Sequence, residues 1–305
     1  MAGQLEKRLI KHIEKNGPLT GSELKEVFHE DSLALWQACM LSKKLLIKSI
    51  GTRYLRLDRR VNGFARLSPS ILREFLTYST MGLAENPDAV SEKACKIASH
   101  IEKVSNNKLE LARSIVSNIR KEFGNEWEDK LHICFIIAGD IVYKMAHDVP
   151  RPEHSTGKLV NGSDIDLIII LEDGVSDDFI KKLDNAIYKE KYRALNSPSL
   201  KEEIDYIIKK ISRVKEQLHF DTLKHMIACK ILQEGLFLYG SNNLFLEIKT
   251  LLNKYGVTEM LDDLEKKAHL FRKNAEEYLL QTDTCNAKKE SLNLFYPAEE
   301  SEEFE

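Results

Sequence analysis

The residues best suited to chemistry are Asp164 and Asp166, which head an aliphatic run in the stretch VNGSDIDLIIILED. Because side chains alternate along a strand, both carboxylates would project from one face while Ile165 and Leu167 project from the other. Two carboxylates about 7 Å apart on one strand repel each other and resist burial unless a cation lies between them. Asp205, in the apolar stretch EIDYII, would add a third carboxylate from a second strand. Such hard oxygen ligands suit two Mg²⁺ ions, or Mn²⁺, and a two-metal phosphoryl or nucleotidyl transfer.

Three apolar stretches predict the strands that must position these carboxylates. They are HICFIIAG, which ends at Gly139, then DIDLIII, and finally EIDYIIKK, with the helical spacing of FIKKLDNAIYKEKY between the last two. Runs that are apolar on both faces are typical of strands covered by helices. The sequence therefore predicts a mixed sheet with helices, within an α+β fold.

The same stretches resemble a known family. GSDIDLIII, preceded by CFIIAGD and followed by IDYII, is similar to the polymerase-β-like nucleotidyltransferases, particularly their minimal and bacterial members. The resemblance implies a turn that holds a triphosphate, an Asp-x-Asp pair that binds two Mg²⁺ ions, and a third Asp that completes the site and helps to activate an acceptor hydroxyl. On this chain those roles would fall to Gly139 with Asp140, to Asp164 with Asp166, and to Asp205.

The activity that the resemblance implies is a template-independent transfer of NMP from an NTP, such as ATP, to an acceptor hydroxyl, with release of pyrophosphate. Within the family the acceptor is RNA, protein or a small molecule, and no motif in this sequence selects among them. The fold that it implies is a nucleotidyltransferase-type mixed sheet, with a C-terminal helical region that completes the nucleotide pocket.

Two features depart from the family's pattern. Asp140 stands where a serine is expected, and its charge would face phosphate unless it turns away or helps to hold metal. The 24 residues between Gly139 and Asp164 are more than usual, which predicts a loop near the site that orders when substrate binds. The basic and hydroxyl side chains with which this insert and the later helices could contact phosphate are Lys144, Arg151, Lys158, Ser163, Lys224 and Lys230.

Residues 1–60 show the pattern of three short helices. LEKRLIKHIEK has apolar residues at helical spacing, and the capping box of Thr20 and Glu23 begins a second helix. A third helix is predicted over residues 32–44.

A hairpin is predicted after these helices, because LLIKSIGTRYLRLD alternates apolar and polar residues on both sides of Gly51-Thr52. This order is similar to a winged helix-turn-helix, which implies that residues 32–44 are the recognition helix and that Arg53 and Arg56 lie on the wing. Residues 1–60 contain 12 Lys/Arg against 7 Asp/Glu. A nucleic acid is therefore an expected partner of this segment, with protein contact and an internal structural role as the alternatives.

Helices and a C-terminal tail are predicted for the rest of the chain. PDAVSEKACKIASHIEKV and LELARSIVSNIRKEF are amphipathic and predict two helices, as does most of the chain after residue 215. The expected segments are a winged helix over 1–60, a helical connector over 61–125, the catalytic core over 126–214, a C-terminal helical region over 215–295, and a disordered acidic tail over 296–305.

Composition bounds the broad class. The chain of 305 residues is 43% hydrophobic and 30% charged, it has no apolar run of about 18 residues, and its N-terminus is too charged for a signal peptide. We therefore expect a cytoplasmic protein that does not enter a membrane. The five cysteines form no C-x-x-C pair, which favours free thiols over disulfides or a zinc site; they are Cys39, Cys95, Cys134, Cys229 and Cys285.

Other interpretations stay open at this stage. Asp164 could be an ordinary turn residue with Asp166 solvated at the start of a strand. The domain could be a catalytically inactive nucleotide sensor within a DNA-binding transcriptional regulator. STGK lacks the earlier glycine and the following Ser/Thr of a P-loop. A transition metal is a further alternative for the polar residues of the insert, His147, Asp148, Glu153 and His154.

Overall fold

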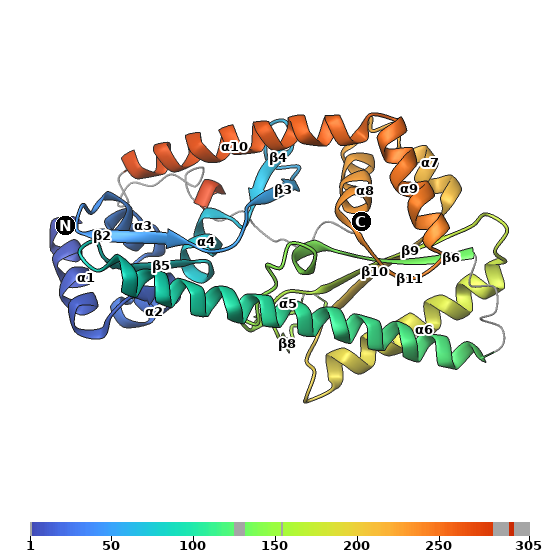
Figure 1. Cartoon of the computed structure of the whole chain (residues 1–305), viewed down its shortest axis with the longest axis horizontal. Coiled ribbons are helices and arrows are strands. Elements are labelled where there is room, and N and C mark those ends of the chain that lie inside the picture. Colours follow the sequence, from blue (N-terminus) through green and yellow to red (C-terminus); the bar gives the residue numbers. More distant parts are fainter. Residues whose placement is uncertain (1, 125–131, 154, 283–292, 296–305) are drawn as a thin grey trace. The chain divides into compact units, whose positions relative to one another are not determined.

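The protein has an α+β fold in two compact units. The computed structural model describes residues 2–124, 132–153, 155–282 and 293–295 (Figure 1). The first unit contains residues 1–100 and 264–300, and the second contains residues 101–263 and 301–305. The boundaries between the two units fall inside helices α5 (Pro87–Phe123) and α10 (Val257–Gln281). These positions differ from the segment ends expected from the sequence, at residues 60, 125, 214 and 295. No helix in the described ranges combines the length and apolar character needed to cross a bilayer.

The first unit begins with the three predicted helices, α1 (Ala2–Asn16), α2 (Gly21–Phe28) and α3 (Ser32–Leu41). The predicted capping box is confirmed, because the Thr20 hydroxyl accepts from the Glu23 N–H and the Glu23 carboxylate accepts from the Thr20 N–H. The helices pack beside an antiparallel three-stranded sheet, ordered β1 (Leu19–Thr20), β5 (Ser79–Leu83) and β2 (Leu45–Ser49).

The predicted hairpin around Gly51-Thr52 is wrong. Strand β2 pairs with β5, whereas β3 (Tyr54–Leu57) pairs with β4 (Ala65–Ser68). The Ile50 N–H donates to the Tyr78 carbonyl at 2.8 Å, which continues the ladder towards β5 instead of closing a turn. Pairing β5 between β1 and β2 buries Met81 fully between Leu19 and Ile47, which lie 62 and 34 positions away in the sequence. A local pattern does not reveal such distant partners, although burying Met81 against them stabilises the fold.

Three further expectations about elements need correction. The stretch SPSILREFLTYSTMGL, which belongs to the expected helical connector over 61–125, contains only the short helix α4 (Ile71–Thr77) and then strand β5. The two helices predicted between residues 87 and 123 are one continuous helix, α5, because no glycine or proline interrupts the polar stretch SNNKLE. LFLYG, predicted to continue a helix, forms strand β11 (Leu236–Gly240).

The predicted recognition helix, α3, packs inside the first unit. Helix α3 is apolar on nearly all sides, with Trp36 among its buried residues. The Trp36 ring contacts the ring of Phe295, with centroids 5.7 Å apart, and the Gln37 amide donates to the Leu279 and Thr282 carbonyls at 2.6 and 2.8 Å. This helix is therefore a packing element of the core, and its contacts leave little of it to enter a nucleic-acid groove.

The predicted wing arginines are likewise engaged within the unit. Arg56 is buried in β3. Arg53 donates to the Glu74 carboxylate at 2.8 and 2.9 Å, and Arg272 of α10 donates to the same carboxylate at 2.5 Å. Because these charges are paired inside the fold, the positive charge counted in residues 1–60 is not all available at the surface.

The second unit is built on a mixed four-stranded sheet. Its order is β10 (Ile204–Lys210), β9 (Ile165–Leu171), β6 (Ile133–Ala138) and β11, with β10 parallel to β9 and the other pairs antiparallel. The three strands predicted from the apolar stretches are confirmed, as is helix α6 (Asp177–Asn196) between β9 and β10.

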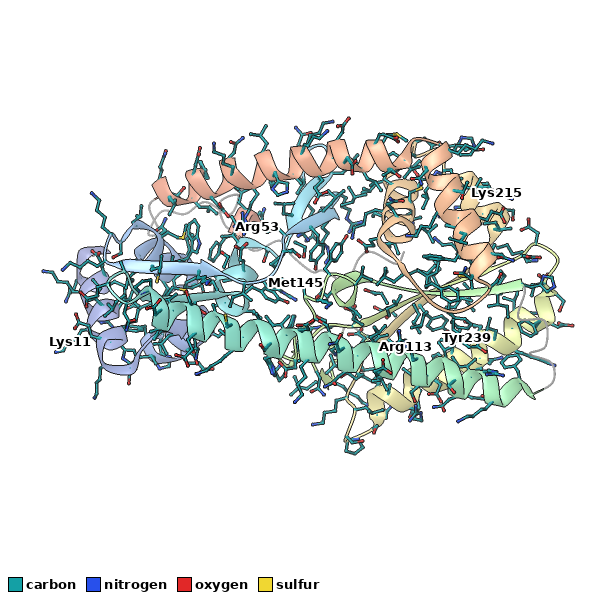
Figure 2. All side chains as sticks on the ribbon, viewed as in Figure 1. Lys11, Arg53, Arg113, Met145, Lys215 and Tyr239 are labelled. Atoms are coloured by element: carbon teal, nitrogen blue, oxygen red, sulfur yellow. The ribbon has the colours of Figure 1, made fainter. Side chains whose placement is uncertain are left out.

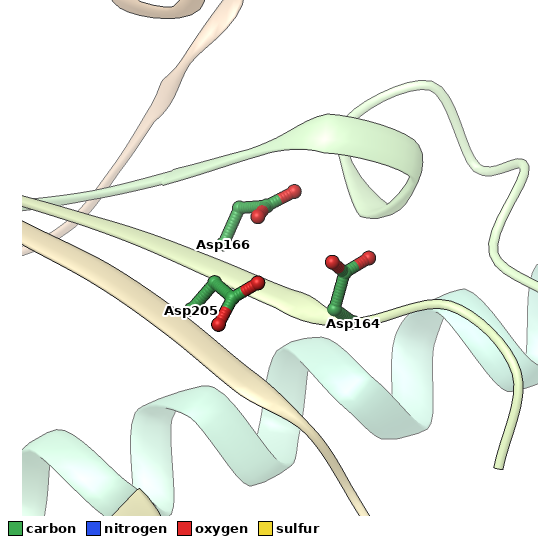
Figure 3. Close-up of side chains that lie close together, drawn as sticks. All are labelled: Asp164, Asp166 and Asp205. Carbon is green, nitrogen blue, oxygen red and sulfur yellow. The ribbon is translucent and has the colours of Figure 1, made fainter. Parts of the chain in front are cut away.

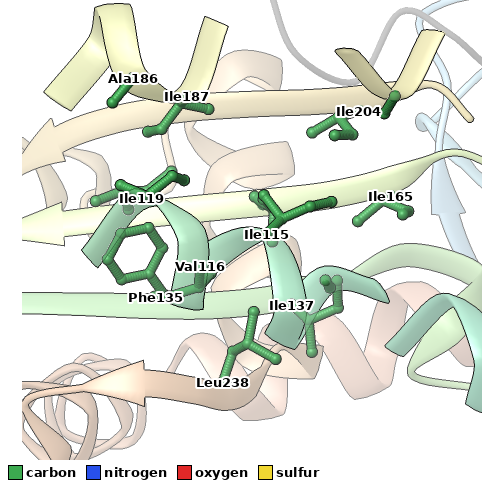
Figure 4. Close-up of a cluster of buried hydrophobic side chains, with 14 of the residues drawn as sticks. Ile115, Val116, Ile119, Phe135, Ile137, Ile165, Ala186, Ile187, Ile204 and Leu238 are labelled. Carbon is green, nitrogen blue, oxygen red and sulfur yellow. The ribbon is translucent and has the colours of Figure 1, made fainter. Parts of the chain in front are cut away.

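Helices cover both faces of this sheet. On one face the core joins Ile115 and Ile119 of α5, Phe135 and Ile165 of the strands, and Ile187 of α6 (Figure 4). The other face meets α8 (Leu223–Glu234) and α9 (Asn242–Lys254), which follow the short α7 (Ile211–Gln217). Figure 2 shows the described side chains along these elements. Asp164 and Asp166 alternate with residues of the first face, and so belong to the second.

Candidate metal centre

Strand pairing brings the three predicted aspartates together. Asp166 in β9 lies directly opposite Asp205 in β10, and Asp164 directly precedes β9. Each side chain offers a carboxylate oxygen that lies within 4.8 Å of the others (Figure 3). Because β9 and β10 are parallel and in register, the separation of 39 positions in sequence becomes a contact at one edge of the sheet.

Gly139 makes room for Asp166. Strand β6 ends opposite Asp166 and turns into a single 3₁₀ turn, Gly139–Ile141, in which Gly139 has a φ of +71°. A Cβ at Gly139 would collide with Oδ2 of Asp166. The turn thus lies where the sequence places it, and its glycine is needed both for the backbone conformation and for the neighbouring carboxylate.

The N–H of Gly139 faces a carboxylate. It donates to Oε1 of Glu234, at the end of α8, over a long 3.4 Å, while the Tyr143 hydroxyl donates to Oε2 at 2.6 Å. Lys230, expected to reach phosphate, is buried and ion-paired with Glu234 at 2.7 Å. A triphosphate at this turn would therefore have to displace Glu234.

Asp140 is turned towards the aspartates. The buried Ser163 hydroxyl donates to Oδ2 of Asp140 at 2.7 Å and accepts from the His147 N–H at 3.2 Å, and the Ser163 N–H donates to the His147 carbonyl at 3.0 Å. Ser163, predicted to contact phosphate, thus holds Asp140. The negative charge of Asp140 lies close enough to Asp164 to raise the pKa of the Asp164 carboxyl.

The insert contributes one cation to the site. Its strands β7 (Arg151–Pro152) and β8 (Leu159–Val160) pair as a small antiparallel hairpin. The Arg151 guanidinium donates through Nε to the Gly162 carbonyl at 2.7 Å, and pairs with Glu203 at 2.8 Å and with Asp164 at 3.8 Å. Arg151 is therefore the insert residue placed to neutralise charge at the centre.

The other predicted insert contacts lie elsewhere. Lys144 is exposed and pairs with Glu102 at 2.6 Å, and Lys158 donates to Asn196 of α6. The carboxylate of Glu153 accepts from Ser155 and Thr156, and these hydrogen bonds outweigh the opposing effect of burial and lower its pKa to about 2. Among described residues the aspartate triad is the one metal-ligating group found, which does not favour a transition metal in the insert; His154 lies outside the described residues.

Two lysines that the sequence analysis missed support the centre. Lys191 of α6 donates to Oδ1 of Asp205 at 2.8 Å. Lys108 of α5 is buried, pairs with Glu202, and donates to the Asn161 carbonyl at 2.8 Å, which ties together the segments that lead into β9 and β10. The sequence pattern could have indicated that Lys108 is buried, because it lies one turn after Val104 on the apolar face of α5. No pattern in the sequence indicates that Lys191 reaches the centre.

Negative charge dominates the centre. The carboxylates of Asp140, Glu203 and the triad meet two cations, Arg151 and Lys191. The pKa of Asp164 is raised to about 6, chiefly because the surrounding protein removes much of the solvent from this partly buried carboxyl; Arg151 lowers it, whereas Asp205, Asp140 and Glu203 raise it. The folded protein therefore stores electrostatic repulsion that a bound cation would relieve.

Comparison of the chain with known proteins finds no relative. No family model, no curated protein and no solved structure matches this chain.

Removing the Asp164 charge is expected to stabilise the metal-free protein in a pH-dependent way. Because the folded-state pKa, about 6, exceeds the ordinary 3.8, the stability that the protonated form provides is present below about pH 4 and lost as pH rises through 6. In EDTA at pH 7.5, Asp164→Asn should raise the free energy of unfolding by about 1–2 kcal/mol, and this gain should shrink towards pH 4.5. Urea unfolding across this pH range would measure it.

The exposed Asp262→Asn removes the same charge away from the centre and provides the control. A stability difference for Asp164→Asn that is the same at every pH would contradict the assignment of the raised pKa.

Proposed function

We propose that the second unit is a Mg²⁺-dependent, template-independent nucleotidyltransferase, which moves NMP from an NTP to an acceptor hydroxyl and releases pyrophosphate. The observation that carries the proposal is the convergence of Asp164, Asp166 and Asp205 within 4.8 Å at one sheet edge. The neighbouring Gly139 turn at the end of β6 supports it, since it stands where the polymerase-β-like family is expected to hold the triphosphate.

The residues present fit divalent magnesium. All three ligands are carboxylate oxygens, which suit Mg²⁺ or Mn²⁺ better than softer metals, and the excess of negative charge favours more than one cation. When bound, the ions would neutralise the triphosphate and favour the ionised acceptor hydroxyl. Asp164 and Asp166 would hold both ions, and Asp205 would hold the one nearer the acceptor.

The chain's own residues would supply positioning and charge. Arg151 is held by Gly162 and Glu203 with its guanidinium beside Asp164, so it would meet a phosphate oxygen with little reorganisation. Lys191 fixes the orientation of the Asp205 carboxylate, which would receive the proton of the acceptor hydroxyl. The Ser163 hydroxyl is held by Asp140 and the triad carboxylates would be occupied as metal ligands, so direct displacement by the acceptor hydroxyl fits best.

A screen with labelled nucleotides tests the proposal. The full chain is incubated with each α-³²P-labelled NTP, with Mg²⁺ or with EDTA, and with RNA, protein or small-molecule fractions of a cell extract. We expect label on one fraction and pyrophosphate release with Mg²⁺ and neither with EDTA. If no NTP gives transfer or pyrophosphate, and the protein instead binds duplex DNA with a strong salt dependence, the alternative of a DNA-binding regulator with an inactive nucleotide-sensing domain is correct.

A further inference from the structure

A cavity lies directly beside the aspartates on the same face of the sheet. It is open to solvent on one side, has a volume of about 380 Å³ and is lined by residues of β9, β10, α7 and α8. Its floor is apolar and includes Ile168, Ile207 and Ile231. Its polar rim includes Lys209, Arg213 and Lys224. The volume suits a small molecule.

Strand register places this cavity next to the centre. Asp205 pairs with Asp166, and the next residues on the same face, Ile207 and Ile168, pair with each other and line the cavity. The cavity therefore begins about 7 Å along the strands from the aspartate pair. It lies on the β10 side of the pair, whereas the Gly139 turn lies across β9 at the end of β6.

The cavity carries positive charge without a carboxylate among its lining residues. Lys209 is partly buried and donates to Oε1 of Gln217 at 3.2 Å. Burial lowers its pKa to about 8, Arg213 lowers it further, and Cys229 opposes the shift. Arg213 pairs with Glu216 at 2.6 Å through Nη1 and keeps its other donors. An anion in the cavity would offset the repulsion between Lys209 and Arg213.

We propose that this cavity binds the acceptor, and that the acceptor is a small phosphorylated molecule with an apolar or flat part. Its phosphate would meet Lys209, Arg213 and Lys224, its apolar part would cover the isoleucine floor, and a hydroxyl would point back to Asp205. The acceptor role rests on the proposed function. In the transfer, the hydroxyl oxygen bonds to the α-phosphorus of the NTP, the bond from that phosphorus to the bridging oxygen breaks, pyrophosphate leaves, and the proton passes to Asp205.

Binding is tested apart from transfer, in EDTA, by calorimetry on the full chain. The probes are ribose 5-phosphate and AMP, with ribose and adenosine as their respective uncharged counterparts, and inorganic phosphate by itself. We expect ribose 5-phosphate and AMP each to bind at least 10-fold more tightly than the uncharged counterpart. Lys209→Gln and Lys224→Gln should each weaken binding about 10-fold, while Lys209→Arg should retain it.

Lys210→Gln is the matched control, because Lys210 is the next residue of β10 and pairs with Asp177 of α6. Equal binding of phosphorylated and uncharged probes, or equal loss with Lys210→Gln, would overturn the phosphate site. If the phosphorylated probes bind through Lys209 but block transfer of label in the NTP screen without receiving it, the acceptor role is overturned while the phosphate site stands. If they bind and no NTP is turned over at all, the proposed function fails instead.

Discussion

Asp166→Asn is expected to abolish nucleotide transfer, with a loss of about 10³-fold, and to weaken Mn²⁺ binding about 100-fold. Asp166 lies between Asp205 on β10 and Ala138 on β6, and is 7% exposed. Its carboxylate would be a metal ligand together with those of Asp164 and Asp205, so a neutral amide at this position removes both a charge and a ligand oxygen from the centre. Titration of Mn²⁺ followed by electron paramagnetic resonance measures the binding, and label transfer measures the activity.

Asp262→Asn is the control for this variant, since it makes the same replacement on an exposed part of α10 and should leave both quantities unchanged. Circular dichroism would establish that Asp166→Asn folds. If the variant binds Mn²⁺ as tightly as the natural chain, the triad is not a metal centre, whatever happens to activity.

Gly139→Ala should reduce transfer at least 100-fold, because the added methyl group would displace the Asp166 carboxylate. A displacement of about 1 Å is enough for such a loss when reacting groups must be aligned. The same replacement places a Cβ in the left-handed region, which costs about 1 kcal/mol on its own. Steady-state transfer and Mn²⁺ binding measure the first effect, and urea unfolding measures the second.

Gly157→Ala separates the two effects. Gly157 has a φ of +69°, close to the +71° of Gly139, but a Cβ there meets nothing within 4 Å. This control should lose about 1 kcal/mol of stability and keep its transfer activity and Mn²⁺ affinity. Equal losses of activity in the two variants would show that backbone strain, rather than the contact with Asp166, explains the result.

Local patterns were enough to predict the centre's framework. Aliphatic runs predicted β6, β9 and β10, and alternation placed Asp164 and Asp166 on one face. That Asp205 lies opposite Asp166 follows from a parallel, in-register pairing, which local spacing permits but does not specify. The roles of these residues stay predictions until metal binding and transfer are measured.

What local patterns could not predict depends on distant partners. β2 pairs with β5 across an insertion that holds β3, β4 and α4, so the nearest alternating stretch was not its partner. Charged residues were the other difficulty. Lys108 and Arg272 can be buried because they form ion pairs with Glu202 and Glu74. A charged residue in a sequence pattern ordinarily indicates a position on the surface.

The contacts of helix α3 have a consequence for the order in which the chain can fold. Its partners Leu279, Thr282 and Phe295 are synthesised more than 240 positions after Gln37. The second unit, residues 101–263, is contiguous among the described residues and has all its strands before α10 emerges from the ribosome. The first unit is complete only when the residues of α10 have been synthesised. During synthesis, the second unit in the middle of the chain can therefore fold before the first unit is complete.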